Sequence, residues 1–258
     1  MNKIHPTAIV SSKAKLGDNL VVHPHAIIND DVEIGDNCSI GPYAVIYDGA
    51  RIGNNVIIHQ SASVSNVPQD LKFGGERTYF YIGDNTTIRE FVTLHRGTGE
   101  KGFSKIGSNC LIMAYVHVPH DCIIGNNVII ANTVQIAGHV EIDDNVIIGG
   151  TTVVHQFTKI GKHCMIGGGF RAIQDVPPFV LAGREPMRYM GLNVVGLRRR
   201  GFTNEDISTL KKVYDILYNS GLTFTKAKEK IKEEYGTVQV AKDVLDFLER
   251  STRGIIRK

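Results

Sequence analysis

Aliphatic residues recur at every sixth position through the first two thirds of the chain. The series begins at Ile4 and ends at Ile166, and 25 of its 28 positions are aliphatic; only Asp70, Glu76 and Glu100 interrupt it. Neither a helical period of 3.6 nor a simple strand period of 2 produces this spacing. A repeated short strand followed by a corner does produce it, so the hexads predict a solenoid of short strands.

A second period of 18 residues sets the size of one coil. The tetrapeptide aliphatic-Gly-x-Asn returns after three hexads within each of two series, at 16–19, 34–37 and 52–55 and at 106–109 and 124–127. Three hexads per coil predict a triangular prism in which aliphatic side chains point inward and coils stack about 4.8 Å apart. We expect Gly and Asn at this corner because both tolerate a positive φ. The predicted fold is mainly β: a parallel β-helix of hexapeptide repeats.

Two breaks in the period predict loops. After Ile52 the next tetrapeptide is expected at position 70 but starts at Ile82, and the one after that is again late, at Ile106. The extra residues fall at about 65–81 and 97–104. Insertions into so regular a repeat commonly carry function.

From about Met187 a helical period replaces the hexads. Residues 203–206 have the pattern of a capping box, and an apolar stripe with helical spacing follows from Ile207 to Leu217. Further helices are expected at 225–234 and 238–249. The predicted organisation is therefore a β-helix over residues 1–186 and a small α-helical domain over residues 187–258.

Four of the ten histidines fall at one edge of the predicted prism. Counting from the corner residues brings His95, His120, His139 and His155 into nearly the same column of four successive coils. The 65–81 loop leaves the prism at this edge. We therefore expect Asp70 and Lys72 of this loop to reach the histidines.

The residues around His120 suggest acyl transfer. Histidine titrates near neutral pH and serves as a general base, and the adjacent Asp121 can orient the imidazole. One coil further on, Gly138 has no side chain to cover its N–H, which can then stabilise an oxyanion. A base and an oxyanion donor are sufficient if the acceptor hydroxyl itself attacks the acyl group.

Composition narrows the class of protein. Lys and Arg number 29 against 26 Asp and Glu, a balance that argues against a nucleic-acid coat, although Arg198–Arg200 form a local basic cluster. No leader-like or membrane-length apolar segment is found, so a soluble cytoplasmic protein is expected. The cysteines contain no CxxC pair and occupy small-residue slots of the hexads, so we expect them to be packing residues; they are Cys38, Cys110, Cys122 and Cys164.

Ordered motifs along nearly the whole chain resemble the UDP-N-acetylglucosamine acyltransferase family of hexapeptide-repeat transferases. The motifs are Gln69–Lys72, His95–Thr98, His117–Asp121, Ala137–His139, His155–Phe157, Gln174–Pro178, Arg199–Phe202 and Arg250–Gly254. The resemblance implies a left-handed coil, although crossover connections are usually right-handed. It also implies a homotrimer with active sites between subunits.

The resemblance also implies a reaction. Members transfer a 3-hydroxyacyl group from acyl carrier protein to the 3-hydroxyl of UDP-N-acetylglucosamine, the first step of lipid A biosynthesis. By position, His120 is the base, Asp121 its support and Gly138 the oxyanion donor. The implied substrate-binding residues are Asp70, Lys72, His95, His117, His139, His155, Gln156, Gly168, Asn193, Arg199 and Arg200. No cofactor or metal is implied, because the donor carries its own phosphopantetheine.

Two positions affect specificity. Relatives tend to have an acidic residue two positions after Asn193, where this chain has Val195, so nucleotide contacts there are open to question. Gly168 matches the family position that limits acyl length, and a glycine there favours a longer chain. Neither the acyl length nor the choice between a 3-hydroxyl and a 3-amino acceptor follows from the sequence.

Other functions remain open at this point. An acetyl- or N-acyltransferase could use the same fold and base. A zinc lyase of the γ-carbonic anhydrase kind also places histidines on a β-helix, and His117, His120 and His139 are the candidate ligands. A non-catalytic scaffold would need none of these residues.

Overall fold

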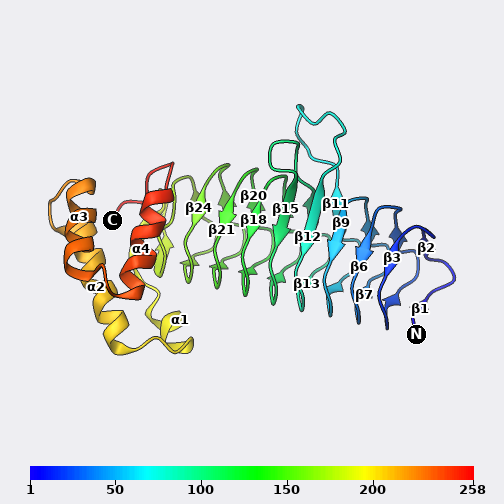
Figure 1. Ribbon diagram of the computed structural model, residues 1–258, viewed down its shortest axis with the longest axis horizontal. Helices are drawn as coiled ribbons and strands as arrows, with labels where there is room; N and C mark the ends of the chain where they lie inside the picture. The colour runs from blue at the N-terminus through cyan, green and yellow to red at the C-terminus, as the bar shows by residue number, and fades with distance from the viewer.

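A parallel β-helix dominates the computed structural model, which describes all 258 residues (Figure 1). Its strands form three sheets, and as far as β26 (Arg171–Ala172) the strands of each sheet come from every third position in chain order, while the last two strands both join one sheet. The β-helix predicted by the hexads is thus confirmed. No α-helix of the protein has the combined length and apolar character needed to cross a membrane.

The three sheets, here called A, B and C, are the faces of the prism. Sheet A consists of β1 (Lys3–Ile4), β4 (Val21–Val22), β7 (Ser39–Ile40), β10 (Ile57–Ile58), β13 (Thr87–Ile88), β16 (Leu111–Ile112), β19 (Ile129–Ile130), β22 (Ile147–Ile148), β25 (Met165–Ile166), β27 (Val180–Gly183) and β28 (Arg188–Leu192). Sheet B consists of β2 (Ile9–Val10), β5 (Ile27–Ile28), β8 (Val45–Ile46), β11 (Ser63–Asn66), β14 (Thr93–His95), β17 (His117–Val118), β20 (Gln135–Ile136), β23 (Val153–Val154) and β26 (Arg171–Ala172). Sheet C consists of β3 (Lys15–Leu16), β6 (Glu33–Ile34), β9 (Ala50–Ile52), β12 (Tyr79–Ile82), β15 (Phe103–Ile106), β18 (Ile123–Ile124), β21 (Glu141–Ile142) and β24 (Lys159–Ile160).

The strand register confirms where the chain departs from the repeat. Ile52 pairs with Ile82, and Ile82 pairs with Ile106, so the extra residues are looped out without shifting the ladder. Loop 1 (residues 67–78) and loop 2 (residues 96–102) connect sheet B to sheet C and project from the same edge (Figure 1). They fall within or beside the predicted ranges 65–81 and 97–104. This edge is called the B–C edge below.

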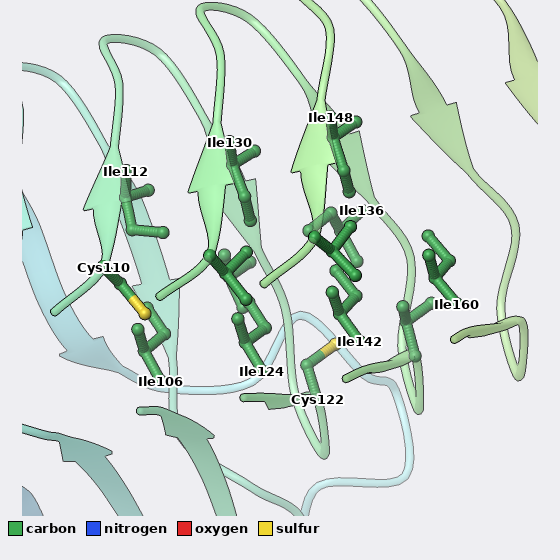
Figure 2. Close-up of a cluster of buried hydrophobic side chains, with 14 of the residues drawn as sticks. Ile106, Cys110, Ile112, Cys122, Ile124, Ile130, Ile136, Ile142, Ile148 and Ile160 are labelled. Carbon is green, nitrogen blue, oxygen red and sulfur yellow. The ribbon is translucent and has the colours of Figure 1, made fainter. Parts of the chain in front are cut away.

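Aliphatic side chains from successive coils stack along the inside of the prism. Figure 2 shows Ile106, Ile124 and Ile142 in one row, with Cys110 and Cys122 filling space beside the isoleucines. All four cysteines are buried free thiols, as the packing interpretation predicts. Burial raises the pKa of the Cys122 thiol to about 12, which keeps the thiol protonated and apolar.

The Gly-x-Asn corner works differently from the prediction. The asparagines have a left-handed backbone, with φ of 57° at Asn37, but the glycines of this corner do not. Gly35 is instead required by close stacking, because a Cβ there would lie 2.5 Å from Asn54 Oδ1 and 2.8 Å from the Gly53 backbone. That same Asn54 oxygen accepts a 2.8 Å hydrogen bond from the Asp36 N–H. Asparagine therefore provides the turn, and glycine the space for this contact between coils.

Four helices cover one end of the prism (Figure 1): α1 (Val194–Arg199), α2 (Asn204–Asn219), α3 (Phe224–Tyr235) and α4 (Gln239–Arg250). The capping box between Thr203 and Asp206 is present, and the three longer helices match the predicted ranges. The six-residue α1 was not expected. Tyr214 of α2 donates a hydrogen bond to the Pro178 carbonyl and so ties the helices to the last coil. Residue 186, the expected boundary, lies between β27 and β28, so the last strand lies beyond it.

Candidate active site

The B–C edge brings together most of the residues singled out from the sequence. His95 ends β14, and His117 begins β17, which is followed by His120 and Asp121. In the next two coils Gly138 and His139 follow β20, and His155 and Gln156 follow β23. Because coils stack in register, the residues after these strands form a column, as the counting predicted.

His120 and Asp121 form a hydrogen-bonded pair. His120 Nδ1 lies 2.8 Å from Asp121 Oδ2, and the Asp121 side chain is fully buried. Asp121 has a φ of 59°, which turns its carboxylate under the neighbouring imidazole. Burial by itself raises the pKa of Asp121, but hydrogen bonds from His120 and Thr98 outweigh it, and the net pKa lies below the usual value. Asp121 is therefore ionised, and its carboxylate accepts a hydrogen bond from the N–H at His120 Nδ1.

The other imidazole nitrogen is left to act as a base. With its hydrogen on Nδ1, His120 presents a lone pair at Nε2, and 14% of the side chain is exposed. Asp70 of loop 1 lies on this side, with Oδ2 3.9 Å from Nε2. A substrate hydroxyl placed between them would contact both groups.

Gly138 lies directly against this imidazole. An added Cβ would be 2.7 Å from His120 Cε1 and 2.8 Å from Nε2, so a larger residue would displace the ring. The Gly138 carbonyl accepts a hydrogen bond from the Phe157 N–H, whereas the Gly138 N–H donates to no group of the protein. A free N–H thus lies close to the proposed base, as an oxyanion donor requires.

Two further histidines, His139 and His117, lie beside the pair. His139 packs edge-on to His120, with ring centres 5.1 Å apart, and stacks on Phe157 at 4.6 Å. His117 is hydrogen-bonded to Thr93 Oγ1 at 2.8 Å. Burial, with help from the neighbouring His95 and His120, lowers the pKa of His117 to about 4, so that its ring is neutral at pH 7.

A pocket of about 750 Å³ opens beside the pair. Loop 1 contributes Asp70, Leu71 and Lys72, and the coils contribute His120, His139 and Gln156. This volume is typical of small-molecule sites. The prediction that loop 1 reaches the histidines is confirmed by this lining.

Other predicted residues do not join this pocket within one chain. Gly168 follows β25 and therefore lies at the edge between sheets A and B. Asn193 caps α1 at the helical end, accepting from the Gly196 N–H and donating to the His163 carbonyl. Arg199 and Arg200 lie at the end of the same helix, and His155 is exposed outside the pocket.

Two residues of the site were missed from the sequence. Thr98 donates two hydrogen bonds to Asp121, and Phe157 stacks on His139. The position of loop 2 at the histidine edge was the available signal for Thr98. Val195, which stands where relatives tend to have an acidic residue, lies in α1 with 62% of its surface exposed.

The histidine cluster does not fit a zinc ion held by His117, His120 and His139. The potential ligand atoms that lie within 4.8 Å of one another belong to His120, Asp121 and His139, and not to His117. Both Asp121 oxygens already accept hydrogen bonds. The donor set is that of a hydrogen-bonded acid–base pair.

Comparison with known proteins first defines the class. Residues 31–66 and 103–138 match the family "Bacterial transferase hexapeptide (six repeats)", and residues 175–256 match "Udp N-acetylglucosamine O-acyltransferase; Domain 2". The fold and these matches are thus those of a hexapeptide-repeat acyltransferase.

Full-length relatives define the family more closely. The chain is 55% identical over 255 residues to an acyl-[acyl-carrier-protein]–UDP-N-acetylglucosamine O-acyltransferase of Chlorobaculum parvum, covering 98% of this chain and 97% of the relative. It resembles the UDP-N-acetylglucosamine acyltransferase structure from Bacteroides fragilis (45% identity, TM-score 0.96, 98% of this chain and 100% of that one). The Francisella novicida structure is similar (39% identity, TM-score 0.96, 99% and 94%). The chain belongs to the UDP-N-acetylglucosamine O-acyltransferase family.

Proposed function

We propose that this enzyme transfers a 3-hydroxyacyl group from acyl carrier protein to the 3-hydroxyl of UDP-N-acetylglucosamine, the first step of lipid A biosynthesis. The observation that carries the proposal is the His120–Asp121 pair beside the free Gly138 N–H. The name of the relative that is 55% identical supplies the donor and the acceptor.

The chemistry uses His120 as base and then as acid. Nε2 removes the proton from the sugar hydroxyl while its oxygen attacks the thioester carbonyl, and Asp121 stabilises the imidazolium that forms. The Gly138 N–H donates to the oxyanion of the tetrahedral intermediate. When this intermediate collapses, the C–S bond breaks and the proton moves from Nε2 to the leaving thiolate. Every proton and electron pair is then accounted for without a cofactor, since the phosphopantetheine belongs to the donor.

The residues around the pair would hold the substrates. Lys72 supplies a cation for the diphosphate, while Asp70 and Gln156 supply acceptors and donors for the sugar. His139 lines the same pocket. We assign His95, His117 and His155, which lie along the same edge outside the pocket lining, to the remainder of the bound substrates. These contacts come from loop 1 and from four successive coils.

We propose that the working enzyme is a homotrimer. The assigned nucleotide residues Asn193, Arg199 and Arg200 lie on α1 at the helical end, and Gly168 lies on the A–B edge of the prism. Neither group lines the pocket of its own chain. Association that brings these parts of one subunit to the B–C edge of another would complete the site and would place Gly168 beside the acyl chain. We also propose that the enzyme is cytoplasmic, as the sequence led us to expect.

The direct test is to incubate the protein with UDP-N-acetylglucosamine and a mixture of acyl carrier proteins bearing 3-hydroxyacyl chains of several lengths. Mass spectrometry of the nucleotide-sugar products is expected to find one ester per sugar, with the longer chains preferred. A parallel reaction uses the 3-amino analogue of the acceptor, for which less product is expected. Complete absence of acylated sugar would contradict the proposal, and exclusive amide formation would favour an N-acyltransferase.

A further inference from the structure

The buried carboxylate of Asp121 depends on a residue outside the regular coil. It accepts three hydrogen bonds, of which His120 Nδ1 supplies one. Thr98 of loop 2 supplies the other two, from its N–H to Oδ1 (3.0 Å) and from its hydroxyl to Oδ2 (2.7 Å). The inserted loop therefore provides most of the hydrogen bonding of this anion.

Thr98 is itself held in one position. Its carbonyl accepts a 2.8 Å hydrogen bond from the Gly102 N–H, which closes loop 2 on itself. The next residue, Gly99, donates its N–H to Glu76 of loop 1 at 2.9 Å. Thr98 is only 8% exposed, so its hydroxyl is committed to Asp121 rather than to water.

Two imidazoles lie near the oxygen that the Thr98 hydroxyl contacts. His120 Nδ1 lies 2.8 Å from Asp121 Oδ2, and His139 Nε2 lies 3.8 Å from the same atom. Rotation of the carboxylate by a few tens of degrees would alter both distances. Two donors from Thr98, one on each oxygen, fix the plane of the carboxylate and so keep Oδ2 aligned with His120.

We propose that Thr98 is a positioning residue that selects the catalytic tautomer of His120 through Asp121. With the carboxylate fixed, the His120 proton stays on Nδ1, and Nε2 remains the unprotonated atom facing the pocket. This inference rests on the proposed function for its effect on turnover. Its effect on the imidazole is independent of the reaction.

Three variants separate this role from simple loss of packing. Thr98→Val keeps the shape and the backbone N–H but removes the hydroxyl, and Thr98→Ser restores the hydroxyl. Thr86→Val is the matched control, because Thr86 is a fully buried threonine whose hydroxyl donates to the Gly107 carbonyl on the edge between sheets C and A.

The kinetic expectation is a loss confined to kcat. Thr98→Val should lower kcat about tenfold, the usual effect of removing one hydrogen bond to a charged group, with KM changed less than about twofold. Thr98→Ser should recover most of this loss, and Thr86→Val should show none. In an Asp121→Asn background, Thr98→Val should lower kcat much less, because the effects of residues that act through a shared partner are not additive.

Nitrogen-15 NMR of the histidine side chains supplies the readout that needs no substrate. The wild-type enzyme should show His120 as the Nδ1–H tautomer at pH 7.5, and Thr98→Val should show a mixture of tautomers. An unchanged tautomer together with an unchanged kcat in Thr98→Val would overturn the inference. If the wild-type protein forms no acylated sugar, the proposed function fails, while the NMR comparison still decides the role of Thr98.

Discussion

Gly138 and His120 are in such close contact that a Cβ on the glycine would lie 2.7 Å from the imidazole Cε1. Glycine is therefore required at this position by the ring of the preceding coil, since Gly138 does not have a positive φ. The contact also brings the free Gly138 N–H close to the proposed base. The absence of a side chain at Gly138 thus allows the proposed base and the proposed oxyanion donor to lie next to each other.

Gly138→Ala should lower turnover by about tenfold to a hundredfold, because the displaced imidazole no longer faces the acceptor. Steady-state kinetics would measure the loss, and circular dichroism would check the fold. Gly183→Ala is the control, since its Cβ would make an ordinary 3.4 Å contact with Phe170. Equal turnover in the two variants would mean that the contact has no catalytic role.

His120→Ala should reduce turnover by a factor on the order of a hundred to ten thousand, as expected when a general base is removed, while the β-helix remains folded. His120 fills no part of the aliphatic interior, so little stability should be lost. His5→Ala, at an exposed position on another edge, should leave turnover unchanged. Near-wild-type activity of His120→Ala would remove the proposed mechanism.

The two corner residues Gly35 and Asn37 should respond to substitution in opposite ways. Gly35→Ala should lower the free energy of unfolding by about 1–3 kcal/mol, because its Cβ would overlap the next coil. Asn37→Gly should lower the free energy of unfolding much less, because glycine adopts the φ of 57° without strain. Thermal unfolding of both variants would measure the difference, and equal losses would contradict the distinct roles assigned to these residues.

His163 should make the protein less stable in mild acid. Burial and the neighbouring Arg200 and Lys162 lower the pKa of His163 to about 4 in the folded state, whereas an unfolded histidine has a pKa of about 6.5. Between these values the unfolded state binds more protons, so the free energy of unfolding falls as the pH decreases from about 6.5 to about 4. His163 Nδ1 is buried without a hydrogen-bond partner.

The His163→Phe variant tests this pH dependence. Phenylalanine should keep the stacking on Phe179 and Phe202 without taking up a proton. Urea unfolding at several pH values should therefore show a smaller loss of stability below pH 6.5 than in the wild-type protein. The exposed His5→Phe should show no such change, and parallel curves for wild type and His163→Phe would refute the role of His163.

Much of the site followed from counting residues. Because coils stack in register, the 18-residue period was sufficient to bring His120, Gly138 and His139 to one edge and to direct loop 1 toward them. The hexads could not reveal why glycine occupies the Gly-x-Asn corner. Its role depends on a contact with the next coil, whereas φ preference is a local property.

The amino-acid sequence determined the β-helix, its triangular coil, the two loops and the column of histidines, because all of them depend on a repeat in which each coil packs only on its neighbours. The hand of the coil does not follow from the period, and its expected left-handed sense came from family resemblance. Only the tertiary structure decided that Asp121 accepts two hydrogen bonds from Thr98, which lies in a loop with no repeat to define its path. Such contacts arise between irregular segments, and their geometry is set by packing across the fold rather than by spacing along the chain.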